Sequence, residues 1–484
     1  MEEKCAPARI SPPDLLIVLV IALGAFMASL DVTIVNIALP AIAASLDIPT
    51  SAVSWVITSY LIVMVSLLLA ASRLGDREGY RKVFLLGFAL FTLGSLLCGI
   101  SGSLSMLVLF RMLQAAGGAM ISALGAVMVA SSLPASTRGQ ALGIVAMFAS
   151  LGIALGPVLG GFLTTAFGWH AIFLVNVPVG ILAIALGVRI VPSTPPVSPG
   201  GRMDAAGIVL VFTALAGLIY ALSAAQDTGF TMPLLAVVGL ALALWSLFFL
   251  HEKRTPGALL DLTLLANRAF AGNSIGMLLL MMGAAGATFL SPFYLEGVRG
   301  LSTDTSGVVM LAFPVALILT APIAGRVSDS IGTRKVAIAG FAAGALGFFA
   351  LSTLTPASRI GHVALGLFLL GSGAGIASPP LQSAVMGEAP PEKRGIASGF
   401  LRMMMNLGSA VGIPLFGLVA TTVLGPLAVH GTGAVHLVIP PAHLTAAFRA
   451  AFLTGAAISI SALVLLFMTP DTRPEAGGET EPVI

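Results

Sequence analysis

Long apolar segments separated by short polar ones run through the whole chain. A helix that crosses a membrane needs roughly 20 mostly apolar residues, and windows of that kind predict about fourteen spans. We expect them near 15–39, 52–71, 83–100, 104–130, 139–166, 170–190, 205–222, 232–250, 269–290, 305–325, 336–354, 360–386, 395–423 and 446–468. The pattern therefore predicts an all-α integral membrane protein.

A charged segment that lies between two of these spans occurs twice. Residues 72–82 read Ser-Arg-Leu-Gly-Asp-Arg-Glu-Gly-Tyr-Arg-Lys, and residues 325–335 read Gly-Arg-Val-Ser-Asp-Ser-Ile-Gly-Thr-Arg-Lys. In register, Arg73, Asp76, Gly79, Arg81 and Lys82 recur as Arg326, Asp329, Gly332, Arg334 and Lys335. A repeat of this kind predicts two related halves, which is how many secondary transporters are built.

The position of a second repeat indicates two additional helices between the halves. Arg138-Gly139 opens the fifth predicted span and Arg394-Gly395 opens the thirteenth. We therefore expect two pseudo-symmetric six-helix bundles at 1–190 and 269–470. Residues 191–268 would hold a linker and two inserted helices, and 471–484 a cytoplasmic tail.

Composition and charge place this fold in a membrane. With 57% hydrophobic and 9% charged residues, too few polar side chains exist to cover a water-soluble globule. Lys and Arg concentrate in the loops on the side of the N-terminus, which predicts that both termini are cytoplasmic and that the protein lies in the cell membrane. The same asymmetry explains the net charge of +3, so we expect no nucleic-acid partner.

Asp31 is the only carboxylate well inside a predicted span, and we find none in the spans of the second half. Placing Asp at mid-membrane costs about 2.5 to 3.5 kcal/mol, and residues kept at that cost are functional by default. Burial favours the protonated form of a carboxyl group, whereas a nearby cation favours the ionised form. We therefore interpret Asp31 as a proton-coupling group; the alternative is a structural Asp bonded to Thr33, Asn36 or a neighbouring helix.

Two arginines also lie within predicted spans. A guanidinium does not titrate in proteins, so Arg111 can only attract, repel or hold a partner. Beside Asp31 it would make protonation depend on conformation; the alternative, a packing Arg bonded to backbone carbonyls, stays open. Arg402 lies about two turns from the inner end of its span, where we favour a side chain that extends to the headgroups.

Small residues mark close helix packing in the fifth span. Gly152, Gly156 and Gly160 are four residues apart and line one face, beside Pro157 and Gly161. This stripe predicts a tight helix contact, and Gly408 and Gly412 repeat it in the thirteenth span.

The repeated charged segments predict a latch on the inner side. Asp76 and Asp329 can each face the N-terminus of a helix in the other half, where negative charge is favourable. Gly79 permits a sharp reversal, and Arg77, Arg81 and Arg334 supply basic anchors to anionic headgroups. The alternative is that these are ordinary loop charges.

Several of these segments together resemble one known family. Residues 30–40 (Leu-Asp-Val-Thr-Ile-Val-Asn-Ile-Ala-Leu-Pro), the segment 72–82, Arg111-Met-Leu-Gln114 and 152–161 resemble the motifs of the fourteen-span drug:proton antiporter branch of the major facilitator superfamily. The chain departs from the family pattern at Ser72, Ala115 and His170-Ala171. The resemblance implies a small-molecule substrate, protons as coupling ions and no cofactor. It also suggests cavity-lining roles for Asn36, Trp55, Tyr60 and Gln114.

The sequence thus favours proton-coupled export of lipophilic or cationic small molecules (drugs) by alternating access, in a monomer. The alternatives are a proton-coupled exporter of lipids or metabolites, or an uptake symporter. We expect no enzyme, because no span contains a metal cluster, a Ser/His/Asp set or a nucleotide-binding loop. His430, His436 and His443 lie in the longest outer loop, where we expect solvated side chains rather than a metal site.

Overall fold

A computed structural model describes residues 10–193, 195–196, 204–255, 262–390, 394–424 and 441–470. Within these ranges all regular secondary structure is helical, and no strand occurs. Fourteen helical segments are long and apolar enough to cross a membrane. The predicted all-α membrane architecture is therefore confirmed.

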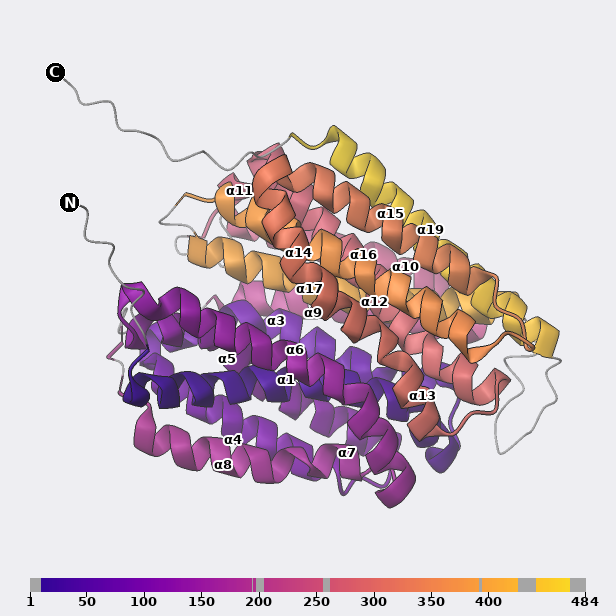
Figure 1. The fold of residues 1–484 in the computed structure, drawn as a ribbon, viewed down its shortest axis with the longest axis horizontal. Helices are drawn as coiled ribbons and strands as arrows, with labels where there is room; N and C mark the ends of the chain where they lie inside the picture. Colours follow the sequence, from indigo (N-terminus) through magenta and orange to yellow (C-terminus); the bar gives the residue numbers. More distant parts are fainter. Residues whose placement is uncertain are drawn as a thin grey trace.

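The first half of the chain forms a bundle around α1 and α5 (Figure 1). Its helices are α1 (Pro12–Leu46), α2 (Thr50–Val53), α3 (Trp55–Glu78), α4 (Tyr80–Cys98), α5 (Leu104–Ser132), α6 (Ala135–Phe167), α7 (Ala171–Leu174) and α8 (Asn176–Ile190). α1 packs along α6, whereas α3 and α4 pack on α5 and α8 packs on α4.

The second half repeats this arrangement. Its helices are α12 (Arg268–Phe293), the π-helical turn η1 (Tyr294–Val298), α13 (Thr303–Met310), α14 (Ala312–Ile331), α15 (Thr333–Ser352), α16 (Ile360–Gly387), α17 (Arg394–Leu424) and α19 (Pro441–Met468). α12 packs on α17 as α1 packs on α6, and α14 and α15 pack on α16 as α3 and α4 pack on α5. The same pairings in the same chain order account for the repeat in the sequence.

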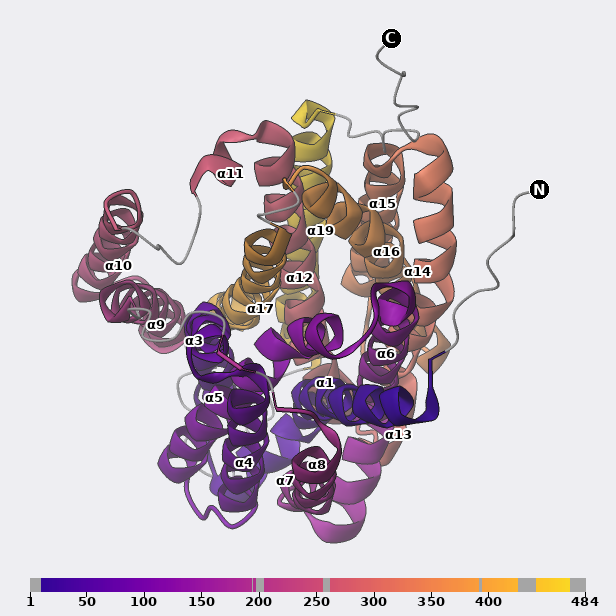
Figure 2. The same ribbon diagram turned by 90° about the vertical axis from the view of Figure 1, so that its left-hand side faces the viewer.

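Two further membrane helices lie between the halves in the sequence and at the edge of the bundle in space (Figure 2). α9 (Ala205–Thr228) packs on α10 (Met232–Glu252), and α9 also contacts α3 and α17. A short helix, α11 (Leu262–Ala266), precedes α12.

The repeated charged segments end helices rather than forming loops. α3 continues to Glu78 and α14 to Ile331, so the chain reverses at a single glycine in each half. Gly79 has φ 92° and Gly332 has φ 98°, a region that only glycine adopts without strain. The expected loop at 72–82 is therefore mostly helix, because one residue of positive φ suffices for the reversal.

The two halves meet at one end of the bundle. We call the end where α1 begins and α19 ends the terminal end, and the other the opposite end. Figure 1 shows the halves converging where α13 lies and separating toward the two termini. At the opposite end α6 of the first half packs on α13 of the second. The halves also touch where α1 contacts α12 and where α3 contacts α17.

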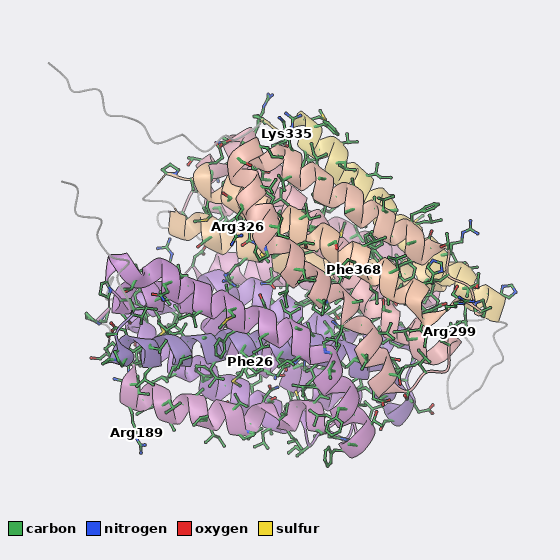
Figure 3. The ribbon with its side chains drawn as sticks, viewed as in Figure 1. Phe26, Arg189, Arg299, Arg326, Lys335 and Phe368 are labelled. Carbon is green, nitrogen blue, oxygen red and sulfur yellow. The ribbon has the colours of Figure 1, made fainter. Side chains whose placement is uncertain are left out.

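Charged side chains also differ between the ends (Figure 3). Arg189, Arg326 and Lys335 lie at the terminal end, and Arg299 lies at the opposite end. The long sides carry exposed apolar residues, including Phe162, Ile181 and Leu240, as expected where a helix faces lipid.

Candidate functional site

An ion pair lies in the interior of the first half. The Arg111 Nη1 on α5 donates to Oδ2 of Asp31 on α1 at 2.6 Å, and both side chains have 0% exposure. The structure thus brings together the two charged residues that lie deepest in the predicted spans of this half. Such burial is expensive unless both charges also receive hydrogen bonds.

Amide side chains supply those hydrogen bonds. Gln114 Nε2 donates to Asp31 Oδ1 at 2.8 Å, while Gln114 Oε1 accepts from Arg111 Nη1 at 2.7 Å. Asn176 at the start of α8 donates to Asp31 Oδ1 at 3.4 Å and to Ser95 Oγ at 3.2 Å. Ser95 also accepts from Gln114 at 3.1 Å. The carboxylate is therefore surrounded by donors from α5 and α8, with Ser95 of α4 behind them.

Arg111 is held on its other sides by α3 and α7. Its Nε donates to the Val56 carbonyl at 3.0 Å, and its guanidinium lies 4.2 Å from the ring centroid of Tyr60. The Phe173 ring lies 5.7 Å away on another side. Nη2 has no hydrogen-bond partner in the described part of the chain. Aromatic faces attract a desolvated guanidinium, so Arg111 keeps favourable contacts apart from Asp31.

The four residues suggested as cavity-lining do not lie together. Gln114 and Tyr60 contact Arg111 and are fully buried. Asn36 is 9% exposed and lies further along α1 toward the opposite end, and the half-buried Trp55 begins α3 at that end. In this structure Gln114 and Tyr60 therefore support the ion pair rather than line an open surface.

The glycine stripe of α6 packs on α1 over its whole length. A Cβ at Gly152 would lie 2.6 Å from the Phe26 carbonyl oxygen, and Gly156 and Gly160 are equally close to side chains further along α1. Thr33 Oγ1 donates to the Gly152 carbonyl at 3.3 Å across this contact. In the second half Gly408 and Gly412 of α17 contact the backbone of α12 in the same way.

Pro157 and Gly161 face the other half of the molecule. A Cβ at Gly161 would lie 2.7 Å from the Thr303 carbonyl oxygen on α13, and Gly307 of α13 approaches the Pro157 carbonyl oxygen. One helix thus makes two backbone contacts, to α1 within its half and to α13 across the opposite end.

Three residues of the expected latch, Asp76, Arg81 and Arg334, each make a contact within their own half. Asp76 Oδ1 accepts from the Tyr80 hydroxyl at 2.8 Å. Arg81 donates to the Val188 carbonyl at the end of α8, and its counterpart Arg334 donates to the Phe467 carbonyl at the end of α19. Each basic residue therefore ties the repeated segment to the last helix of its half.

The remaining members of the latch set are peripheral. Arg77 Nε lies 3.4 Å from Glu78, whose partner one turn later is Lys82 at 2.7 Å. The hydrogen bond from Lys82 holds the pKa of the Glu78 carboxyl below its usual range. The side chain of Asp329 lies outside the described part of the structure, as do residues 471–484 and both His430 and His436.

Comparison with known proteins decides the family. A model of the Major Facilitator Superfamily matches residues 21–302 and 273–482. The chain belongs to this superfamily. It is 35% identical over 402 residues to the riboflavin transporter RibZ of Clostridioides difficile, covering 83% of this chain and 87% of that one. It is 33% identical over 413 residues to the tetracenomycin C resistance and export protein of Streptomyces glaucescens, covering 84% and 76%.

A solved structure shows the same fold. A bacterial homologue of the human lysosomal transporter Spinster, in an inward-facing and occupied conformation, superposes with a TM-score of 0.68 at 14% identity. The match covers 95% of this chain and 97% of that one. This fold, together with the family match and the fourteen candidate spans, shows that the chain is a multi-pass membrane transporter.

The structure of this transporter corrects one expectation about carboxylates. The span predicted at 269–290 continues through η1, so the candidate span is Arg268–Val298 and contains Glu296. Glu296 Oε2 accepts from Thr303 Oγ1 at 3.1 Å, whereas its buried Oε1 has no hydrogen-bond partner among the described residues. The span predicted from apolar residues stopped at residue 290, because polar residues and Pro292 interrupt the apolar pattern just before this π-helical turn.

Ser95 and Asn176 were missed for another reason. Both are uncharged polar residues within or beside apolar windows, and such residues are common in membrane helices that pack closely. Only their contacts with Gln114 and Asp31 single them out. Among the described residues no group of three His, Cys, Asp or Glu side chains could hold a metal ion.

Proposed function

We propose that this protein exports lipophilic or cationic small molecules in exchange for protons, by alternating access. The observation that carries the proposal is the buried pair of Asp31 and Arg111, one titratable charge held by one that does not titrate. The similarity to a tetracenomycin C resistance and export protein supports the direction of transport. We further propose that the protein acts as a monomer in the cell membrane, with both termini in the cytoplasm.

The arrangement of the halves supports an alternating-access cycle. They are in contact at the opposite end through α6 and α13 and are separated at the terminal end. With cytoplasmic termini this is an inward-facing state, the conformation named for the Spinster homologue. Export then requires a second state in which the terminal end closes and the contact of Gly161 with Thr303 opens.

Proton binding at Asp31 would couple these states. The carboxylate now accepts hydrogen bonds from Arg111, Gln114 and Asn176, which stabilise its charge. A proton arriving from outside would cancel that charge and release Arg111, which keeps its bond to the Val56 carbonyl and its contact with Tyr60. Each conformation would thereby favour a different protonation state, which is the condition for coupling.

The driving force sets what such a transporter achieves. One proton entering down about 100 mV and one pH unit supplies roughly 2.3 plus 1.4 kcal/mol. That energy supports a gradient of several hundredfold for a neutral solute. For a monovalent cation the two charges cancel, and only the roughly tenfold pH contribution remains.

The test is flux of a fluorescent drug in proteoliposomes with and without an imposed pH gradient. We expect Asp31→Asn, a mimic of the protonated form, to abolish uphill transport while passive exchange persists. Asp31→Glu should keep partial coupling with an altered pH profile. Asp47→Asn, which removes an exposed carboxylate just after α1 at a left-handed position that Asn also adopts, is the matched control and should behave as wild type. Uphill transport by Asp31→Asn in proportion to the pH gradient would place the proton site elsewhere.

The second candidate is uptake of a metabolite together with protons. It is favoured by the 35% identity to a riboflavin transporter. The same vesicles distinguish the two, because an antiporter accumulates substrate on the acidic side and a symporter accumulates it on the alkaline side.

A further inference from the structure

Within the described part of the second half, one charged side chain inside a candidate span has no hydrogen-bond or ion-pair partner. Arg402 lies on α17, within the candidate span Ala397–Leu424, and its side chain is exposed. No hydrogen bond or ion pair joins it to any other residue of the described chain, in contrast to Arg111. A charge inside a membrane span persists only where water or a partner reaches it.

The packing of α17 shows which way Arg402 points. Gly408 and Gly412 contact α12, and Gly417 contacts Gln226 of α9. At about 100° per residue, Arg402 lies about 120° around the helix from Gly408, between the sides that face α12 and α9. α3 of the first half also contacts α17. This helix geometry places Arg402 between the sides of α17 that face α12 and α9, and α3 of the first half lies beside α17 there (Figure 2).

The same face of α17 changes from covered to open along its length. Ile413, eleven residues after Arg402, returns to within about 20° of its direction and is only 2% exposed. Arg402, in contrast, is exposed. The face is therefore covered toward the opposite end, where the halves meet, and accessible toward the terminal end, where they separate.

Neighbouring polar residues continue this accessible face. Ser398 and Asn406 lie four residues before and after Arg402, so the three are aligned on one side of the helix. Ser398 is exposed and Asn406 is half-buried. Arg402 lies about 8 Å along the helix from Ala397, where the candidate span begins, so extension to the headgroups is the competing expectation. The lipid comparison below distinguishes it from substrate binding.

Among the described residues, the interior carboxylates are engaged elsewhere. Asp31 is occupied by Arg111 and the amides around it, and Glu296 lies in η1 at the opposite end of α12. We propose that Arg402 binds the anionic group of a transported molecule: a carboxylate, sulfonate or phosphate on an otherwise lipophilic body. The proposal rests on the proposed function, because it takes the space between the halves as the substrate path. Among the lipophilic molecules of that function, it favours those that carry an anionic group over those that carry only a positive charge.

Binding of two matched dyes to purified protein in nanodiscs tests this site without a proton gradient. 1-Anilinonaphthalene-8-sulfonate carries a sulfonate that N-phenyl-1-naphthylamine lacks, and both fluoresce in apolar sites. We expect Arg402→Gln to weaken sulfonate binding by about ten- to a hundredfold, as expected for loss of a hydrogen bond to a charged group. Binding of the uncharged dye should stay unchanged.

Two variants make the comparison specific. Arg402→Lys keeps the charge but loses the planar fork of donors, so its sulfonate affinity should fall between wild type and Arg402→Gln. Arg189→Gln removes an exposed charge at the terminal end of α8 and should bind both dyes as wild type does. If Arg402→Gln does not fold, Arg402→Lys decides alone. The proposal is overturned if this variant binds the sulfonate dye as tightly as the wild-type protein does.

Three other outcomes would also overturn it. One is unchanged sulfonate binding in Arg402→Gln, and another is an equal loss of both dyes. The third is competition by anionic lipid, seen as weaker sulfonate binding to wild type in phosphatidylglycerol than in phosphatidylcholine nanodiscs, because Arg402 would then hold a headgroup. If the wild-type protein bound the sulfonate dye through Arg402 as expected but showed no proton-driven flux, that result would count against the proposed function alone.

Discussion

Removing either member of the Asp31–Arg111 pair should loosen the first half far more than removing both. The two groups are 2.6 Å apart at 0% exposure, so Asp31→Asn leaves a buried guanidinium without its counter-charge, and Arg111→Gln leaves a buried carboxylate. Breaking a buried pair in this way costs about 3 to 5 kcal/mol. In the double variant two neutral amides face each other, and most of that cost disappears.

Cys98 supplies a reporter inside the same network. It is the last residue of α4, is fully buried, and its Sγ lies 3.9 Å from Gln114 Oε1. In a Cys5→Ser background it is the only thiol, so its labelling rate by a small maleimide measures how often this region opens. A loss of 3 to 5 kcal/mol corresponds to labelling faster by about two to almost four orders of magnitude, at 1.36 kcal/mol per decade.

The double variant decides whether the two charges act as a pair. We expect it to label at least about thirtyfold more slowly than the product of the two single effects, a coupling of about 2 kcal/mol. Glu78→Gln, Lys82→Gln and their combination break an exposed ion pair and should leave the Cys98 rate nearly unchanged. Single effects that multiply in the double variant would refute the view that these charges stabilise each other.

Three further predictions concern how the halves move, and double electron–electron resonance between spin labels on the two halves measures the first two. Gly161→Val should lengthen distances at the opposite end, because a Cβ there meets the Thr303 backbone at 2.7 Å; unchanged distances would show that this contact does not hold that end closed. Asp76→Asn should increase the inward-open population if Asp76 closes the terminal end, since an amide interacts less with a helix N-terminus by about 0.3 to 1 kcal/mol; an unaltered distribution counts against the latch. Glu296→Gln should strengthen closure of the opposite end, because a neutral amide suits the buried Oε1, which has no hydrogen-bond partner among the described residues, better than a charge; slower labelling of a cysteine at Ser306, which is fully buried on α13, by an impermeant maleimide checks this, and faster labelling contradicts it.

Sequence patterns predicted the helices well because the bilayer demands long apolar windows. They predicted the ends less well. The segment after residue 72 is helix to Glu78, since a charged helix end beyond the membrane has no hydropathy signal. Glu296 was lost for a related reason, because the π-helical turn η1 extends the span past the polar residues that closed the window.

The candidate site was predictable in its charges and not in its partners. Asp31 and Arg111 stand out because any charge in a span is costly. Their contact depends on how α1 and α5 are rotated, and spacing along two different helices does not determine that. The bonds from Arg81 and Arg334 to main-chain carbonyls were also unpredictable, since every residue offers the same acceptor.

Those two arginines bear on which parts of the transporter move together. Arg81 joins the start of α4 to the end of α8, and Arg334 joins the start of α15 to the end of α19, so each bond lies within one half. The glycine contacts of α6 with α1 likewise join helices of one half along their length. Between the halves, by contrast, the contact of Gly161 with the Thr303 backbone lies at the opposite end. A rotation of one half against the other therefore leaves these internal bonds intact and has to break the contact of α6 with α13, which makes the opposite end a place where a proton or substrate can change the balance between the two states.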